Sequence, residues 1–170
     1  MPGSKTQPLN TIPLPVHKPH RLRHAALLLI PLALTACSGK KDGHHLYATN
    51  CGICHHGGGG QKGEVPPLTG RLGIIAATKE GRAYLAAVLM NGLGGPITAN
   101  GEPYSAGMPP FRYLDDETVA KILTWLAAQD TQGTPPVITP AEIAKARARP
   151  VSSGDVALMR ENLNRQHPIP

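Results

Sequence analysis

Residues 51–55 of this chain read Cys51-Gly52-Ile53-Cys54-His55, and this stretch decides the fold. On a helical turn, residues three apart share a face, so the two thiols lie together and the imidazole follows at the next position. This C-x-x-C-H spacing is that of haem attachment, in which both sulfurs bond to the vinyl groups of one haem and the imidazole binds its iron. The motif predicts one covalently attached haem c, held by Cys51, Cys54 and His55.

Three other uses of a C-x-x-C pair compete with haem: a thioredoxin-like redox pair, half of a zinc site and a structural disulfide. A thioredoxin fold needs βαβ units, and the flanking sequence has no alternating strand pattern. A zinc site needs further Cys or His ligands at a second spacing, which the sequence lacks. The nearby His44, His45 and His56 are expected to be exposed rather than ligating, because histidine is usually partly exposed. The sequence favours haem and leaves the disulfide open.

Bulky side chains are scarce throughout the sequence. The chain has one Phe, one Trp and four Tyr in 170 residues, which is little material for a large apolar core. A porphyrin would supply much of the missing interior. No stretch reaches the roughly 18 to 20 consecutive apolar residues of a membrane-spanning helix, and no repeat of about 20 to 50 residues runs through the chain. These observations exclude transmembrane and solenoid folds.

The segment 42–130 resembles the class I c-type cytochromes. Gly43 and Tyr47 precede the motif on one helix face, and in that family such a glycine and aromatic residue cross the C-terminal helix. The expected partner helix spans 114–128, with an acidic first turn and an apolar stripe, and a middle helix is expected over 79–91. The resemblance implies an all-α cytochrome c fold, with three main helices wrapped around one covalent haem.

Two further residues complete the expected haem site. The segment 64–70 resembles the family's loop in which a proline carbonyl accepts the ligand histidine's other N–H, and Pro66 matches that proline. Met108 lies on a proline-bracketed loop directly before the last helix, where class I cytochromes present a thioether to iron. Met90 is expected to pack within the middle helix, and Met159 lies beyond the haem domain. Ligation by His and Met fills both axial sites, which argues against a peroxidase or gas carrier.

The N-terminal segment has the pattern of an export signal. Residues 18–24 are basic, and residues 25–36 are apolar apart from one threonine, a run too short to span a bilayer. The end of this run, residues 34–37, resembles the lipobox of bacterial lipoproteins, which implies that Cys37 is lipidated and becomes the first mature residue. An ordinary signal peptide is the alternative. Ser38 resembles the outer-membrane sorting pattern, so we expect a lipid-anchored protein on the periplasmic side of a bacterial membrane.

The chain is expected to divide into four parts. These are a lipoprotein signal peptide (1–36), a lipidated cysteine with a short tether (37–42), a cytochrome c haem domain (43–132) and a C-terminal extension (133–170). In the extension, residues 138–147 and 151–160 align with each other, and each begins with a capping-box pattern that predicts a short helix. Neither helix is long enough to be stable alone. They must pack on the haem domain or on a partner protein.

Charge distribution limits the possible functions. The net charge of +6 divides into +4 in residues 1–37, 0 in residues 38–134 and +2 in residues 135–170. A nucleic-acid binder concentrates positive charge on its folded domain, so that class is excluded. The sequence predicts a one-electron carrier rather than an enzyme, working between redox partner proteins. The alternatives are a subunit docked permanently on an exported dehydrogenase or terminal oxidase, for which the neutral centre argues, and a haem-lipoprotein sensor.

Overall fold

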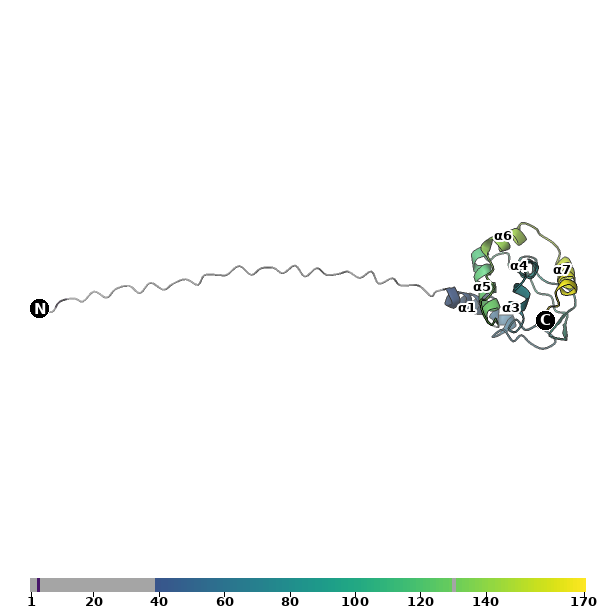
Figure 1. Cartoon of the computed structure of the whole chain (residues 1–170), viewed down its shortest axis with the longest axis horizontal. Coiled ribbons are helices and arrows are strands. Elements are labelled where there is room, and N and C mark those ends of the chain that lie inside the picture. The colour runs from purple at the N-terminus through teal and green to yellow at the C-terminus, as the bar shows by residue number, and fades with distance from the viewer. Residues whose placement is uncertain (1–2, 4–38, 130) are drawn as a thin grey trace. The chain divides into compact units, whose positions relative to one another are not determined.

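The computed structural model describes residues 39–129 and 131–170, together with Gly3 (Figure 1). The signal segment and Cys37 therefore lie outside the described residues. Within this range the elements are α1 (Gly39–Asn50), α2 (Gly52–His55), α3 (Leu72–Ala76), α4 (Lys79–Asn91), β1 (Ile97–Ala99), β2 (Glu102–Tyr104), α5 (Asp116–Ala128), α6 (Pro140–Arg147) and α7 (Ser153–Gln166). The fold is all-α, as the sequence predicts. No helix in the described part of the chain is long and apolar enough to cross a membrane.

Helices α1 and α5 cross at Gly43, and Figure 1 shows them side by side. A Cβ atom on Gly43 would lie 2.5 Å from the Trp125 Cβ atom and 2.9 Å from the Lys121 carbonyl oxygen. The absence of a side chain thus lets the two helices approach closely. The buried ring of Tyr47, one turn later, lies 5.0 Å from the Trp125 ring between centroids. The crossing predicted from the glycine and the aromatic residue is present.

Helix α5 forms because its first turn is capped and one face is apolar. The Asp115 side chain accepts a 2.7 Å hydrogen bond from the backbone N–H of Thr118, which satisfies one of the free donors at the helix N-terminus. The apolar stripe is buried at Val119, Ile122, Leu123 and Leu126. Helix α4 is capped in the same way by Thr78 and buries the face predicted for it, at Tyr84, Leu85, Val88 and Leu89.

The two helices of the C-terminal extension pack on the rest of the chain. Both capping boxes are formed, by Thr139 with Glu142 and by Ser152 with Asp155. Helix α6 contacts α4 and α5, while α7 contacts α4, so that α4 lies between them in the view of Figure 1. Their buried side chains are Ile143, Val156, Arg160 and Leu163. Helix α7 continues to Gln166, beyond the repeat that predicted it.

Two elements were not expected from the sequence. Helix α3 is a five-residue helix, too short for periodicity to reveal. Strands β1 and β2 form an antiparallel hairpin in which Ile97 pairs with Tyr104. Its turn is Asn100-Gly101, with both residues at positive φ (50° and 79°). Asn-Gly is a strong hairpin signal, but strands of three residues give no alternating pattern to read.

We predict that Gly43→Ala lowers the free energy of unfolding by about 2 kcal/mol, because the added methyl group overlaps Trp125 and the α5 backbone. Gly154→Ala is the matched control. It lies in α7, where the nearest atom to an added Cβ is 3.7 Å away, and alanine should stabilise the helix by up to about 1 kcal/mol. Urea unfolding followed by circular dichroism measures both, and equal effects in the two variants would contradict the crossing.

Candidate functional site

Both cysteines of the motif lie at the start of α2. Cys51 occupies the N-cap position and its carbonyl oxygen accepts hydrogen bonds from the backbone N–H groups of Cys54, at 3.2 Å, and His55, at 2.9 Å. This tight turn places the three side chains of the motif within one turn of helix. Both thiols are free, with Cys51 buried and Cys54 exposed. Burial, reinforced by the neighbouring Cys54, raises the pKa of Cys51 to about 11.

His55 is held in a defined orientation by one hydrogen bond. Its side chain is 7% exposed, and its Nδ1 atom lies 3.1 Å from the carbonyl oxygen of Pro66. A proton on Nδ1 satisfies that carbonyl and leaves the lone pair of Nε2 available to a metal. Burial lowers the pKa of His55, and the charge of Arg71 adds to this effect. The site therefore favours the neutral imidazole, which is the form that binds iron.

The Pro66 carbonyl is brought to His55 by a compact loop that follows the motif. Backbone hydrogen bonds join Gln61 and Val65 in an isolated bridge, and the N–H of Leu68 donates to the carbonyl of Gly58 at 2.7 Å. These bonds fold the loop back on the motif. The acceptor for His55 is thus a backbone carbonyl in a fixed position rather than a mobile side chain.

Met108 is fixed by backbone pairing with Leu93, two residues after the end of α4. Its N–H donates to the Leu93 carbonyl at 2.8 Å, and the Leu93 N–H donates to the Met108 carbonyl at 3.0 Å. Directly before Leu93, Gly92 has φ of 76°, and a Cβ there would lie 2.6 Å from the Met108 carbonyl oxygen. This backbone geometry and close approach require glycine. Met90, by contrast, is fully buried in α4, as the sequence predicts.

All five residues predicted for the site line one cavity: Cys51, Cys54, His55, Pro66 and Met108. The cavity is open at its mouth, and its empty volume, open solvent included, is about 1240 Å³. The remaining walls are mostly apolar and come from α3, α4 and α5. The side chains of these walls are Leu72, Ile75, Leu85, Val88, Leu89, Ile122, Leu123 and Leu126.

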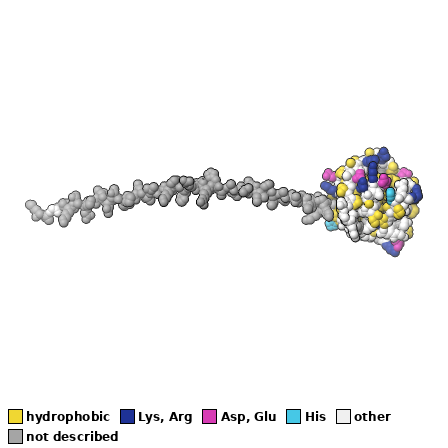
Figure 2. Space-filling model, in the orientation of Figure 1, with side chains coloured by type: hydrophobic (Ala, Val, Ile, Leu, Met, Phe, Trp, Pro, Cys, Tyr) yellow, Lys and Arg dark blue, Asp and Glu magenta, His cyan; other side chains and the backbone are white. Residues whose placement is uncertain are grey.

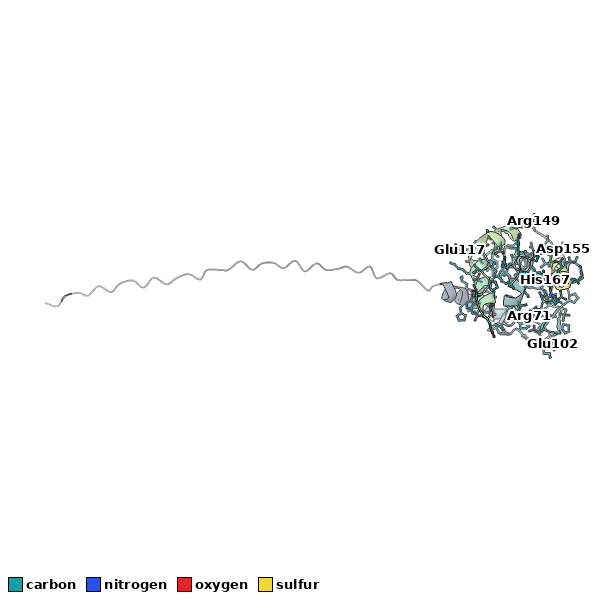
Figure 3. The ribbon with its side chains drawn as sticks, viewed as in Figure 1. Arg71, Glu102, Glu117, Arg149, Asp155 and His167 are labelled. Atoms are coloured by element: carbon teal, nitrogen blue, oxygen red, sulfur yellow. The ribbon has the colours of Figure 1, made fainter. Side chains whose placement is uncertain are left out.

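Two buried arginines form a cationic wall of this cavity that sequence reasoning missed. Arg71 and Arg160 both line it, together with the buried Tyr84 and Tyr104. Arg71, labelled in Figure 3, lies near the C-terminus marked in Figure 1. The guanidinium groups of Arg71 and Arg160 both donate to the Pro170 oxygen. Neither is paired with a carboxylate side chain of the described residues. A buried arginine has no sequence signature, so no motif could have identified this wall.

This wall carries two buried positive charges. Burial, together with the charge of Arg160, lowers the pKa of Arg71 to about 10. Burial also raises the pKa of Tyr84, while the charge of Arg160 and a hydrogen bond to it oppose that rise. Arg71 donates to the oxygens of Pro67 and Pro170, and Arg160 donates to those of Thr98 and Pro170. The cavity therefore combines an apolar interior with one cationic end.

The alternatives to haem fit this geometry poorly. The two cysteines form no disulfide, and no βαβ unit is present among the described elements. Within the described part of the chain, no three His, Cys, Asp or Glu side chains are close enough to hold a metal ion together. His44, His45 and His56 are exposed. Free thiols beside a neutral imidazole, in a large apolar cavity with a cationic end, fit a covalently attached porphyrin.

Comparison with known proteins identifies the family. Residues 39–126 match the family model described as cytochrome c oxidase, cbb3-type, subunit III. The chain is 37% identical over 145 residues to a cytochrome c-552 of Thermus thermophilus, covering 82% of this chain and 94% of that protein. A second Thermus thermophilus cytochrome c-552 is 37% identical over 128 residues, covering 72% of this chain and 96% of its own length. This protein therefore belongs to the class I c-type cytochromes, electron-transfer proteins with covalently bound haem c.

Proposed function

We propose that this cytochrome is a one-electron carrier whose haem c is attached through Cys51 and Cys54 and ligated by His55 and Met108. The observation that carries the proposal is that these four side chains line one cavity. When bound, haem c supplies an iron that alternates between the ferrous and ferric states, so an electron is taken up and released without bond chemistry on a substrate. The chain's own residues hold, orient and shield that group.

Each of these residues has a separate task. The hydrogen bond from His55 Nδ1–H to the Pro66 carbonyl fixes the orientation of the ring and makes the imidazole a stronger electron-pair donor to iron. The Met108 thioether would be the second protein ligand of the iron, and a thioether ligand favours the ferrous state and raises the reduction potential. With His55 and Met108 both bound, the iron would offer no open site to oxygen. This favours an electron carrier over a gas sensor.

The cationic wall is proposed to receive the propionate carboxylates of the haem. Arg71 and Arg160 are buried, line the cavity and lack a carboxylate side-chain partner among the described residues. Guanidinium groups bind carboxylates through paired, charge-assisted hydrogen bonds. Because Arg160 belongs to α7, the C-terminal extension contributes directly to the cofactor site.

The second candidate is an electron-transfer subunit docked permanently on a larger complex, such as an exported dehydrogenase or a terminal oxidase. The family model is named for a subunit of an oxidase. Residues 38–134 are electrically neutral, and on the face in Figure 2 basic and acidic side chains are interspersed. A freely diffusing carrier commonly uses a strong field of one sign to steer encounters. Purification from membranes, followed by tests of which co-purified proteins reduce or oxidise the haem, separates the two candidates.

Anchoring at a bacterial membrane is the last part of the proposal. Cys37 follows an apolar run with lipobox-like residues, and an acylated cysteine with several acyl chains gives a stable anchor, at about 0.8 kcal/mol for each buried methylene. We propose that the mature protein begins at Cys37 and faces the periplasm, with Ser38 directing it to the outer membrane.

Met108→Ala tests the ligand assignment. Haem should stay attached, but the iron should gain an open site, and the reduction potential should fall by on the order of 0.1 V or more, within the roughly 0.8 V range that axial ligands span. The ferric spectrum should lose its weak methionine-to-iron band, and carbon monoxide should bind readily. Met90→Leu, a volume-conserving change in packed α4, should leave all three properties unchanged. An unaltered spectrum in Met108→Ala would refute the assignment.

Arg160→Met tests the cationic wall. Removing one positive charge from the cavity should lower the reduction potential by roughly 40 mV, because a unit charge near the iron contributes about 1 kcal/mol to the preference for the ferrous state. Arg165→Met is the matched control, since Arg165 lies on the same helix and is exposed. Redox titration of both variants decides the matter: equal shifts, or no shift in Arg160→Met, would rule out the propionate contact.

Cys37→Ser tests the anchor. Serine cannot form the thioether-linked lipid, so this variant should be released from membranes or retain its signal segment. Mass spectrometry of the purified protein reports both acylation and the N-terminus. Acyl chains still present on the variant would exclude Cys37 as the attachment site.

A further inference from the structure

The loop that carries Met108, residues 105–114, contains two consecutive prolines directly after the methionine. We refer to this segment as the Met108 loop. Pro109 and Pro110 lack N–H groups, so directly after Met108 the chain cannot donate backbone hydrogen bonds. On the side facing α4, the loop is held by the Met108–Leu93 pair and by the Phe111 N–H, which donates to the Leu89 carbonyl at 2.7 Å. Where the loop turns back toward α5, the backbone carbonyls of residues 112 and 114 accept hydrogen bonds from a side chain.

These contacts are made by one side chain of the C-terminal extension. Arg147, the last residue of α6, donates through Nη1 to the Arg112 carbonyl at 2.7 Å and through Nη2 to the Leu114 carbonyl at 2.6 Å. Its Nε atom lies 2.7 Å from the Asp116 carboxylate at the start of α5. Arg112 returns the contact, since its Nη2 donates to the Arg147 carbonyl at 2.7 Å. A single guanidinium group thus joins the loop, the start of α5 and the end of α6.

Arg112 extends this network to α4. Its Nη1 atom donates to the Met90 carbonyl at 3.2 Å, near the end of that helix. The two arginines therefore close the Met108 loop between α4 and α6 with charge-assisted hydrogen bonds, which are about twice as strong as neutral ones. Neither arginine lines the haem cavity. Any effect that they have on the iron must pass through the position of the loop.

We propose that Arg147 is a positioning residue for the methionine ligand, through which the C-terminal extension sets how firmly the Met108 sulfur is held on the iron. The inference rests on the proposed function, because it requires Met108 to be the ligand. With Arg147 in place, the loop is fastened at Met108 by Leu93 and again at residues 112 and 114 by Arg147, so the thioether stays close to the iron. Without it, the segment 112–114 loses two carbonyl contacts and the detached state is populated more often.

The chain offers a matched control at the other end of α6. Arg82 of α4 pairs with Glu142 at 2.7 Å, the same distance as the Arg147–Asp116 pair. The side-chain exposures are also similar, at 23% and 26% for the first pair and 29% and 28% for the second. Both pairs fasten α6 to the body of the protein. Only Arg147 of the two also binds the Met108 loop.

The experiment compares haem-loaded Arg147→Met and Arg82→Met with the parent protein. Carbon monoxide binding to the ferrous form measures how often the methionine leaves the iron, and the weak methionine-to-iron band of the ferric form measures how much remains bound. Arg147→Met should bind carbon monoxide roughly tenfold faster and show a weaker band. Arg82→Met should lose similar stability in urea yet match the parent in both optical measurements. Equal behaviour of the two variants, or an unchanged rate in Arg147→Met, would overturn the proposal.

Arg147→Lys covers the case in which Arg147→Met fails to fold. Lysine keeps the charge beside Asp116 but lacks the planar fork with which Arg147 reaches two carbonyls and the carboxylate together. Carbon monoxide binding should therefore again be faster than in the parent, and a parental rate would overturn the proposal. Met108→Ala separates this inference from the proposed function. If that variant leaves the spectrum unaltered, the ligand assignment fails and the role of Arg147 fails with it. If it opens the iron while both Arg147 variants behave as the parent, only the role of Arg147 is wrong.

Discussion

The apolar cavity bounded by α3, α4 and α5 constrains the rest of this structure, because the chain has too few bulky side chains to fill it. Its walls are aliphatic residues that also belong to the hydrophobic core. Under the proposed attachment at α2, the porphyrin would be part of that core as well as the redox centre. Fold and function therefore depend on the same contacts, and a change in the walls affects both.

The C-terminal extension reaches this centre by two separate routes. Helix α7 supplies Arg160 to the cavity wall, while α6 supplies Arg147 to the loop that carries Met108. The capping boxes of both helices explain how such short segments hold their shape. Packing on α4 and α5 buries their apolar faces. The extension thus both supports the fold and contacts the cavity and the Met108 loop.

How much of the structure the sequence could predict depends on how far apart in the chain the interacting residues lie. The motif at 51–55, the crossing at Gly43 and the cap at Asp115 are local patterns with a direct structural meaning, and each is recognisable from residue type and spacing. The cationic wall joins Arg71 to Arg160, residues that lie far apart in the chain. No local rule brings two such residues together, because their meeting depends on the path of the whole backbone. The Asn-Gly hairpin is an intermediate case. Its turn is recognisable from residue type, but strands of three residues are too short to show an alternating pattern.

The position of Arg160 late in the chain has a consequence for the order of assembly. Synthesis runs from the N-terminus, so α2 is made well before α7, and the thiols of Cys51 and Cys54 are present before one wall of the cavity. Until α7 packs on α4, the cavity lacks the side chain of Arg160. The C-terminal extension therefore completes the enclosure last.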